Sequence, residues 1–240
     1  MFDKILFLAV ILVTNIIQGI TGFAGTVLAM PPSLLLVGYS TAKPVLNILG
    51  CLSGWYVFVG NKAHVNWKEL IKIVIIMSLG ILAGIPIRKY FAGSEHSLYK
   101  ILGIFVICLA IHGLFLKQDK QRENSKYSVM LLPLAGIVHG IFVSGGPILI
   151  SYLARRIYDK ISFRATISTV WIFLNSLIFF EELKSGIWNI ELLKTLLITI
   201  PFLFSGMFIG SKLVARMSQE FFLKLTYILL LISGITLLIR

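Results

Sequence analysis

Two short glycine-rich interruptions of apolar segments contain the residues best suited to chemistry. The first runs from Gly19 to Thr26 and the second from Ser144 to Pro147. A break inside a membrane segment frees backbone N–H and C=O groups, which must then line a wet cavity or bind something. N–H groups at the start of a helix attract anions. We therefore expect an anion site at the breaks, although glycines also permit close packing of helices.

The two breaks belong to a repeat, because position 18 matches position 139 and this offset of 121 continues along the chain. The matched positions are Gln18-Gly19-Ile20 with His139-Gly140-Ile141, Gly25 with Gly146, Lys43 with Arg164, and Trp67 with Trp188. Duplicated membrane segments that are interrupted in corresponding places are the best sequence pointer to a transporter's substrate site. We expect one site between the breaks, with one repeat rocking against the other.

The candidate substrate-binding residues are the break residues and the polar side chains near them in apolar surroundings. They are Gln18, Thr21, Gly22, Phe23, Gly25, Thr26, Asn47, His139, Ser144, Gly145, Gly146, Ser168 and Asn175. His139 can bind an anion or take a proton, and it can equally be a neutral side chain bonded to a helix carbonyl. The asparagines and Ser168 can also serve as hydrogen-bond partners between helices.

Charged residues near the apolar runs are expected at the membrane edges. Lys43 and Arg164 can attract an anion to the mouth of a pathway, but anchoring of helix ends is the simpler interpretation. Glu181 and Glu182 follow an apolar run and are expected in a loop. With no acidic residue expected in mid-span, a carboxylate relay for protons or sodium has little support, and protons remain a candidate coupling ion through His139.

The composition is that of a membrane protein, with 58% hydrophobic and 13% charged residues, against about 25% charged in soluble domains. The predicted fold class is all-α: a polytopic integral membrane bundle of two homologous repeats, each with a glycine-broken first segment plus three transmembrane helices. The apolar runs are Ile5–Ile20, Thr26–Val37, Val45–Val59, Leu70–Ile87, Leu98–Leu116, Tyr127–Leu153, Ala165–Phe180, Leu192–Gly210 and Phe221–Ile239.

The predicted boundaries are residues 1–117 for the first repeat, 118–126 for a polar connecting loop and 127–240 for the second repeat. Each repeat carries a pair of glycines four residues apart, Gly80 with Gly84 and Gly206 with Gly210, which favours close helix packing. Residues 5–37 are too long for one straight crossing. The broken segments either bend and cross or return as hairpins, and the distribution of Lys and Arg favours hairpins, inverted repeats and both termini outside.

Several other functions find no support in the sequence. The net charge is +12. The Lys and Arg residues that produce it lie between apolar runs, where they suit contact with lipid headgroups and not binding of nucleic acid. Cys51 and Cys108 lie in apolar runs, no cluster has metal-ligand spacing, and no cofactor is expected. An intramembrane enzyme would need a nucleophile with a base or paired buried carboxylates, and neither is visible. The first apolar run lacks a cleavage site and is expected to be a retained membrane segment. The expected partners are the bilayer and a small anion; the oligomeric state is open.

The glycine patterns resemble the TauE/SafE, or sulfite exporter, family of membrane transporters. The resemblance rests on three segments: Gly19-Ile20-Thr21-Gly22-Phe23-Ala24-Gly25 with Met30-Pro31, Gly140 to Gly146, and Arg164-Ala165-Thr166-Ile167-Ser168-Thr169. Pro147 stands where a further glycine is common, and residues 43–47 lack a small Thr-Ser pair. The resemblance implies transport of a sulfur-containing oxyanion such as sulfite, or of an organosulfonate, in a prokaryotic inner membrane. The alternatives are a transporter for another small organic anion, a passive anion channel, and a structural subunit without transport.

Overall fold

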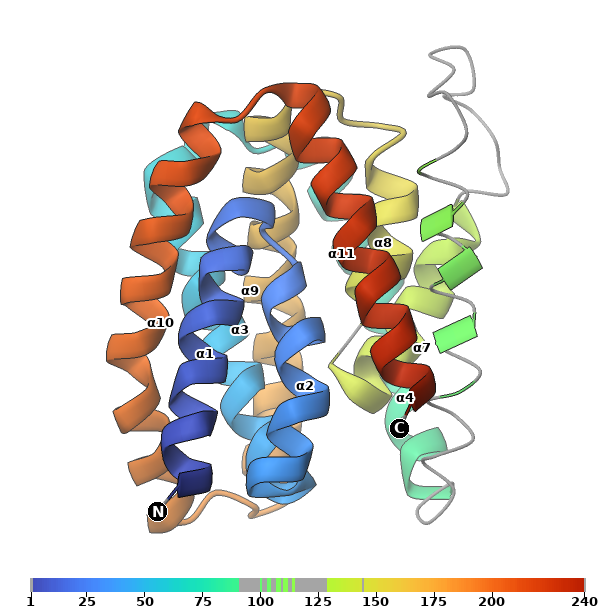
Figure 1. Cartoon of the computed structure of the whole chain (residues 1–240). Coiled ribbons are helices and arrows are strands. Elements are labelled where there is room, and N and C mark those ends of the chain that lie inside the picture. Colours follow the sequence, from blue (N-terminus) through green and yellow to red (C-terminus); the bar gives the residue numbers. More distant parts are fainter. Residues whose placement is uncertain are drawn as a thin grey trace. The chain divides into compact units, whose positions relative to one another are not determined.

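The computed structural model describes residues 2–90, 100, 103–104, 107–108, 110–111, 114, 129–143 and 145–239. Within these residues every regular element is a helix (Figure 1). The elements are α1 (Phe2–Thr21), α2 (Ala24–Val37), α3 (Tyr39–Asn61), η1 (Lys62–His64), α4 (Trp67–Tyr90), α7 (Leu131–Phe142), α8 (Gly146–Leu153), α9 (Lys160–Lys184), α10 (Ile190–Arg216) and α11 (Gln219–Ile239).

The predicted all-α membrane fold is confirmed. Five described helices are long and apolar enough to cross a bilayer: α1, α3 with η1, α4, α9 and α10. The expected connecting loop, residues 118–126, and most of the expected run Leu98–Leu116 lie outside the described residues. The arrangement as two repeats of four segments stays a prediction.

The chain forms two compact units that cut across the halves of the sequence. The first unit consists of Met1–Leu70 and Arg164–Met217, and so contains α1, α2, α3, α9 and α10. The second consists of Ile71–Phe163 and Ser218–Arg240, with most of α4 and with α7, α8 and α11. Each unit therefore contains helices from both halves of the chain.

Both glycine breaks end one helix and start another. At the first break Gly22 has φ +82°, a left-handed conformation that glycine adopts without the penalty a Cβ brings. The chain folds back there, so that α2 packs along α1 (Figure 1). At the second break Val143 has φ +54°, and Pro147 lies in the first turn of α8. The predicted interruptions are thus confirmed.

Small residues bring helix backbones together within each unit. In the first unit a Cβ built at Gly206 of α10 would lie 2.7 Å from the carbonyl oxygen of Leu12 in α1. In the second, a Cβ at Gly84 of α4 would lie 2.5 Å from the carbonyl oxygen of Ile137 in α7. The expectation that these glycine pairs serve packing is confirmed, because neither backbone has room for a larger side chain.

Two helices of the first unit, α3 and α9, pack antiparallel and are the most enclosed of the candidate spans. Their apolar windows are 61% and 72% buried, against 33–44% for the other three. Helix α9 continues four residues beyond the expected end at Phe180, because Glu181, Glu182, Leu183 and Lys184 are all good helix formers. It ends just before Gly186, where φ is +68°. The expectation that the two glutamates lie in a loop is therefore wrong.

Candidate functional site

One face of α9 carries a line of buried polar groups. Its members are Arg164, Ser168, Trp171, Asn175 and Glu182, all buried. Their spacings of four, three, four and seven residues place them on one side of an α-helix. At 1.5 Å per residue the line is about 27 Å long, close to the thickness of the hydrocarbon core, about 30 Å. We call this set the α9 stripe.

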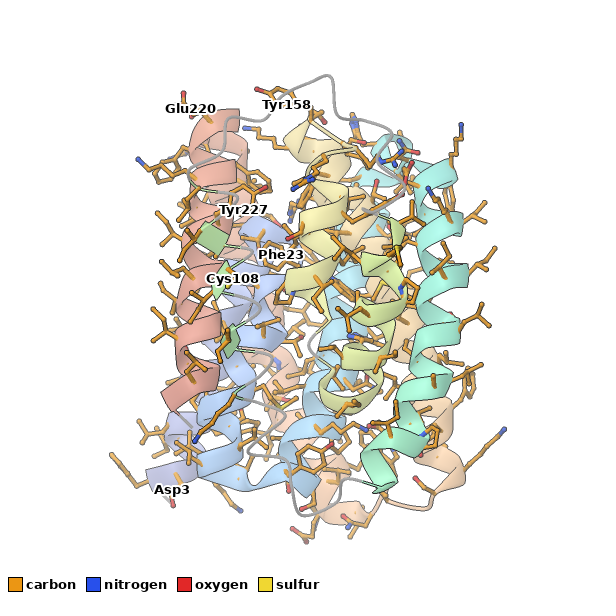
Figure 2. All side chains as sticks on the ribbon, turned by 90° about the vertical axis from the view of Figure 1, so that its right-hand side faces the viewer. Asp3, Phe23, Cys108, Tyr158, Glu220 and Tyr227 are labelled. Atoms are coloured by element: carbon orange, nitrogen blue, oxygen red, sulfur yellow. The ribbon has the colours of Figure 1, made fainter. Side chains whose placement is uncertain are left out.

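The first glycine break lies against the part of the α9 stripe next to Arg164. The carbonyl oxygen of Gly22 accepts hydrogen bonds from Trp171 Nε1 at 2.9 Å and from Ser168 Oγ at 3.4 Å. In Figure 1 the turn between α1 and α2 lies partway along α9 and α10. Figure 2 shows Asp3 at the outer end of α1 and Phe23 well inward of it. The break is therefore an interior feature of this unit.

The amides of the first break are taken by side chains of the protein itself. Gln18 Oε1 accepts from the N–H of Gly25 at 2.8 Å, and Thr21 Oγ1 accepts from Ala24 at 3.1 Å and from Phe23 at 3.4 Å. The Gln18 amide nitrogen in turn donates to Ser53 Oγ at 3.2 Å. The expectation of free N–H groups at this break is thus wrong, because neighbouring side chains supply the oxygens that an anion would supply.

Arg164 lies at one end of the α9 stripe with only 6% of its surface exposed. One guanidinium nitrogen donates to Ser211 Oγ of α10 at 2.7 Å, while the buried Nε has no hydrogen-bond partner. Among the described residues no carboxylate pairs with this guanidinium. A buried cation without a counter-ion is costly, so the position is suited to an anion from outside the protein.

A second charged cluster lies at the other end of the α9 stripe. Lys43 Nζ of α3 is 3.0 Å from Glu182 Oε1, and the two side chains are 4% and 1% exposed. Asn47 Nδ2 donates to Glu182 Oε2 at 3.3 Å and to the carbonyl oxygen of Asn175 at 3.2 Å. Glu182, which was expected in a loop, is therefore buried in the last turn of a candidate membrane span. Anchoring at the membrane edge does not describe Lys43, which is buried inside the protein.

The second break, in the other unit, shows a related arrangement. His139 Nδ1 lies 3.4 Å from the backbone N–H of Gly145, which donates to it. A Cβ at Gly145 would lie 2.8 Å from the His139 Cβ, so the loop sits tightly on the histidine. Gly146 is buried as the first residue of α8, and Ser144 lies outside the described residues. His139 therefore caps its break much as Gln18, its match in the repeat, caps the first.

The structure divides the predicted site residues between the units. The first unit brings together those from both halves of the sequence that lie on α1, α2, α3 and α9: Gln18, Thr21, Gly22, Phe23, Gly25, Thr26, Asn47, Ser168 and Asn175. Thr26 faces α3, since its Oγ1 lies 3.4 Å from a Cβ built at Gly50. His139, Gly145 and Gly146 belong to the second unit. Their roles in binding stay predictions.

Sequence reasoning left the two charged ends out of the site. A helical period continued from Arg164 reaches Ser168, Trp171, Asn175 and Glu182. That period indicates that the charged residues share one helix face with the polar ones. It was missed because the apolar run ends at Phe180, which suggested that the helix ended there too. The match between Lys43 and Arg164 in the repeat was a second signal, since both begin helices that face each other.

Long apolar helices, interior helix breaks and buried charges together define a polytopic membrane transporter. The model of the family "Sulfite exporter TauE/SafE" matches residues 6–237, and the chain belongs to that family. It is similar to the probable inner membrane transporter protein TsaS of Comamonas testosteroni, with 23% identity over 179 residues, 74% of each chain. No solved structure matches the chain.

Proposed function

We propose that this protein transports a small monovalent or divalent anion, a sulfur-containing oxyanion or an organosulfonate, across a prokaryotic inner membrane. Membership of the sulfite exporter family supports the transport activity, and the name of the similar inner membrane transporter supports the location. The substrate class rests on one observation in the structure, the buried guanidinium of Arg164.

Arg164 favours an anion for two reasons. Its charge is removed from water, and the described residues supply no carboxylate to balance it. Its Nε–H is also a buried donor with no hydrogen-bond partner. The planar fork of a guanidinium matches two oxygens of a sulfonate or sulfite group. A cationic or neutral ligand would leave the charge uncompensated.

The polar groups beyond Arg164 supply a path. Ser168, Trp171 and Asn175 continue the α9 stripe past the first break, and Gln18 and Thr21 already hold the break amides. An anion that displaces these two side chains would find the N–H groups of Ala24 and Gly25 ready as donors. The break residues are thus proposed as contacts along the path, with Arg164 at its end.

Binding of matched ligands tests this function. Methanesulfonate, dimethyl sulfone and tetramethylammonium are similar in size and shape but negative, neutral and positive. We expect only methanesulfonate and sulfite to bind the purified protein. Arg164→Gln should weaken methanesulfonate binding about 10- to 100-fold, since hydrogen bonds to charged groups contribute about 1.5–3 kcal/mol. Arg216→Gln, which removes an exposed charge from α10 of the same unit, is the control. Unchanged methanesulfonate affinity in Arg164→Gln would refute the assignment.

A further inference from the structure

The ion pair of Lys43 and Glu182 stands where helix electrostatics oppose it. Glu182 lies in the last turn of α9, where the helix dipole is negative, and Lys43 lies near the start of α3, where it is positive. Neither charge therefore stabilises its own helix. A buried ion pair also stabilises a fold no better than an apolar pair of similar volume. The pair is thus poorly explained by stability, which points to a use for its charges.

An unused acceptor lies beside the carboxylate. Asn47 is fully buried, and its Nδ2 serves both Glu182 and the Asn175 carbonyl, while its Oδ1 has no partner. An ionised carboxylate has only acceptors and offers Asn47 Oδ1 nothing. A protonated carboxyl group has one O–H donor. The cluster therefore holds an acceptor that Glu182 can use only after it takes up a proton.

From these contacts, and resting on the proposed function, we propose that Glu182 is the proton-binding group that couples anion transport to the proton gradient. A proton from the aqueous phase binds a carboxylate oxygen of Glu182, and the net charge of the Lys43–Glu182 pair rises from zero to plus one. Protonation removes the negative charge in contact with Lys43, and Lys43 becomes an anion contact at the end of the α9 stripe opposite Arg164. One proton and one monoanion move together, so the pair is neutral again when both have left.

Coupling of this kind is reciprocal. If protonation of Glu182 strengthens anion binding, then a bound anion strengthens proton binding by the same factor. Anion affinity should accordingly rise as the pH falls, because each partner offsets the charge of the other.

Other titratable groups on the helices of this unit are more exposed than Glu182. Helix α2 has none. On α3, Tyr39 is partly exposed and Cys51 lies two turns beyond Lys43. On α9, Glu181 is partly exposed and Lys184 is exposed. On α10, Glu191 and Lys194 form an exposed pair 3.7 Å apart, and Asp3 and Lys4 of α1 are exposed as well. Glu182 differs from these groups because its carboxylate is fully buried and contacts Lys43. Substituting Glu182 therefore tests this carboxylate separately from the exposed groups.

Infrared difference spectroscopy of the protein in liposomes reads the proton directly. We expect a carbonyl band of a protonated carboxylic acid that grows as the pH falls and that is absent in Glu182→Gln. Added methanesulfonate should strengthen this band at a given pH in the wild type. Lys43→Gln/Glu182→Gln, which removes both charges and keeps polar groups, serves if the single variant fails to fold. Glu191→Gln, in the exposed pair, should keep the band.

Transport in the same liposomes supplies the second readout. Methanesulfonate remains a monoanion throughout, so that any proton movement belongs to the protein. An inward proton gradient should drive its accumulation in the wild type and in Glu191→Gln. Glu182→Gln keeps Lys43 but cannot take up the proton, so it should exchange methanesulfonate across the membrane at equilibrium but lose the accumulation.

The two readouts separate the two claims. If the wild type neither binds nor moves any tested anion, the proposed function fails, while the infrared band still decides whether Glu182 takes up a proton. A band that survives in Glu182→Gln, no band at any pH, or accumulation that survives in Glu182→Gln would overturn the proton site. A sodium-dependent shift of the ionised carboxylate without a protonated band would also overturn it, in favour of a metal cation.

Discussion

Lys43 Nζ lies 3.0 Å from Glu182 Oε1, although the two residues are 139 positions apart in the chain. Arg164, which matches Lys43 in the repeat, bonds instead to the hydroxyl of Ser211. The two helices that begin near these cations pack antiparallel, so one cation stands at each end of the polar face of α9. One is neutralised by the protein, and the other is left for a ligand.

Removing one member of the buried pair should destabilise the protein. Lys43→Met leaves Glu182 buried with no opposite charge, and we expect a loss of about 3–5 kcal/mol. Lys43→Met/Glu182→Met should recover most of this loss, because an apolar pair of similar size tolerates burial. Thermal unfolding in detergent measures both. Equal stability of Lys43→Met and the wild type would show that the pair is hydrated and open.

The first break should tolerate no side chain. Gly22→Ala places a Cβ 2.7 Å from Ser168 Oγ in a residue with φ +82°, so strain and collision add. Gly38→Ala is a matched control, since Gly38 has φ +74° and nothing within 4 Å of its Cβ position. With ψ +165° Gly38 lies in a backbone region that is essentially confined to glycine, so Gly38→Ala should cost about 1–3 kcal/mol of strain alone, and transport should survive. We expect Gly22→Ala to lose methanesulfonate uptake in liposomes, and normal uptake would contradict the role of the turn.

The contact between α1 and α10 should depend on glycine. Gly206→Ala places a Cβ 2.7 Å from the Leu12 carbonyl oxygen and should push the helices apart, which lowers the unfolding temperature. Gly60→Ala in α3 has open space around it and should stabilise by up to about 1 kcal/mol through helix propensity. We expect thermal unfolding to show a lower unfolding temperature for Gly206→Ala and a higher one for Gly60→Ala. A neutral or stabilising Gly206→Ala would place the two helices farther apart.

The cap at the second break should respond to pH. His139 Nδ1 accepts the Gly145 N–H only in a neutral form, and protonation turns this nitrogen into a donor. Stability from this bond is therefore present while the histidine is neutral and lost when it is protonated. We expect the wild type to lose about 0.5–1.5 kcal/mol on acidification.

His139→Gln should remove that pH response. A glutamine oxygen accepts at any pH, as Gln18 does in the first break, so the variant should stay folded and its unfolding temperature should change less with pH. The control is Gln18→His, which should make the first break pH-sensitive instead. If His139→Gln follows the wild-type curve, the histidine is a packing residue.

The sequence alone determined the class of protein and the places where its helices break. Long apolar runs and low charge predict membrane helices, and the matched glycines mark the breaks. At Gly22 the reason is the backbone, since few other residues adopt a positive φ. The repeat also matched Lys43 with Arg164 and Gln18 with His139 before any contact was known. These features are local, or are copied from one half to the other, so pattern alone reveals them.

Only the tertiary structure decided which groups meet. Helix propensity and a helical period allow α9 to continue past Phe180, but nothing in the sequence shows that the partner of Glu182 lies 139 residues earlier. The same holds for the amides of the first break, which seemed free until Gln18 and Thr21 were seen to fill them. Hydrogen bonds and ion pairs need atoms within about 3 Å, and in a chain that folds back on itself this proximity is set by packing of distant helices, not by spacing along the sequence.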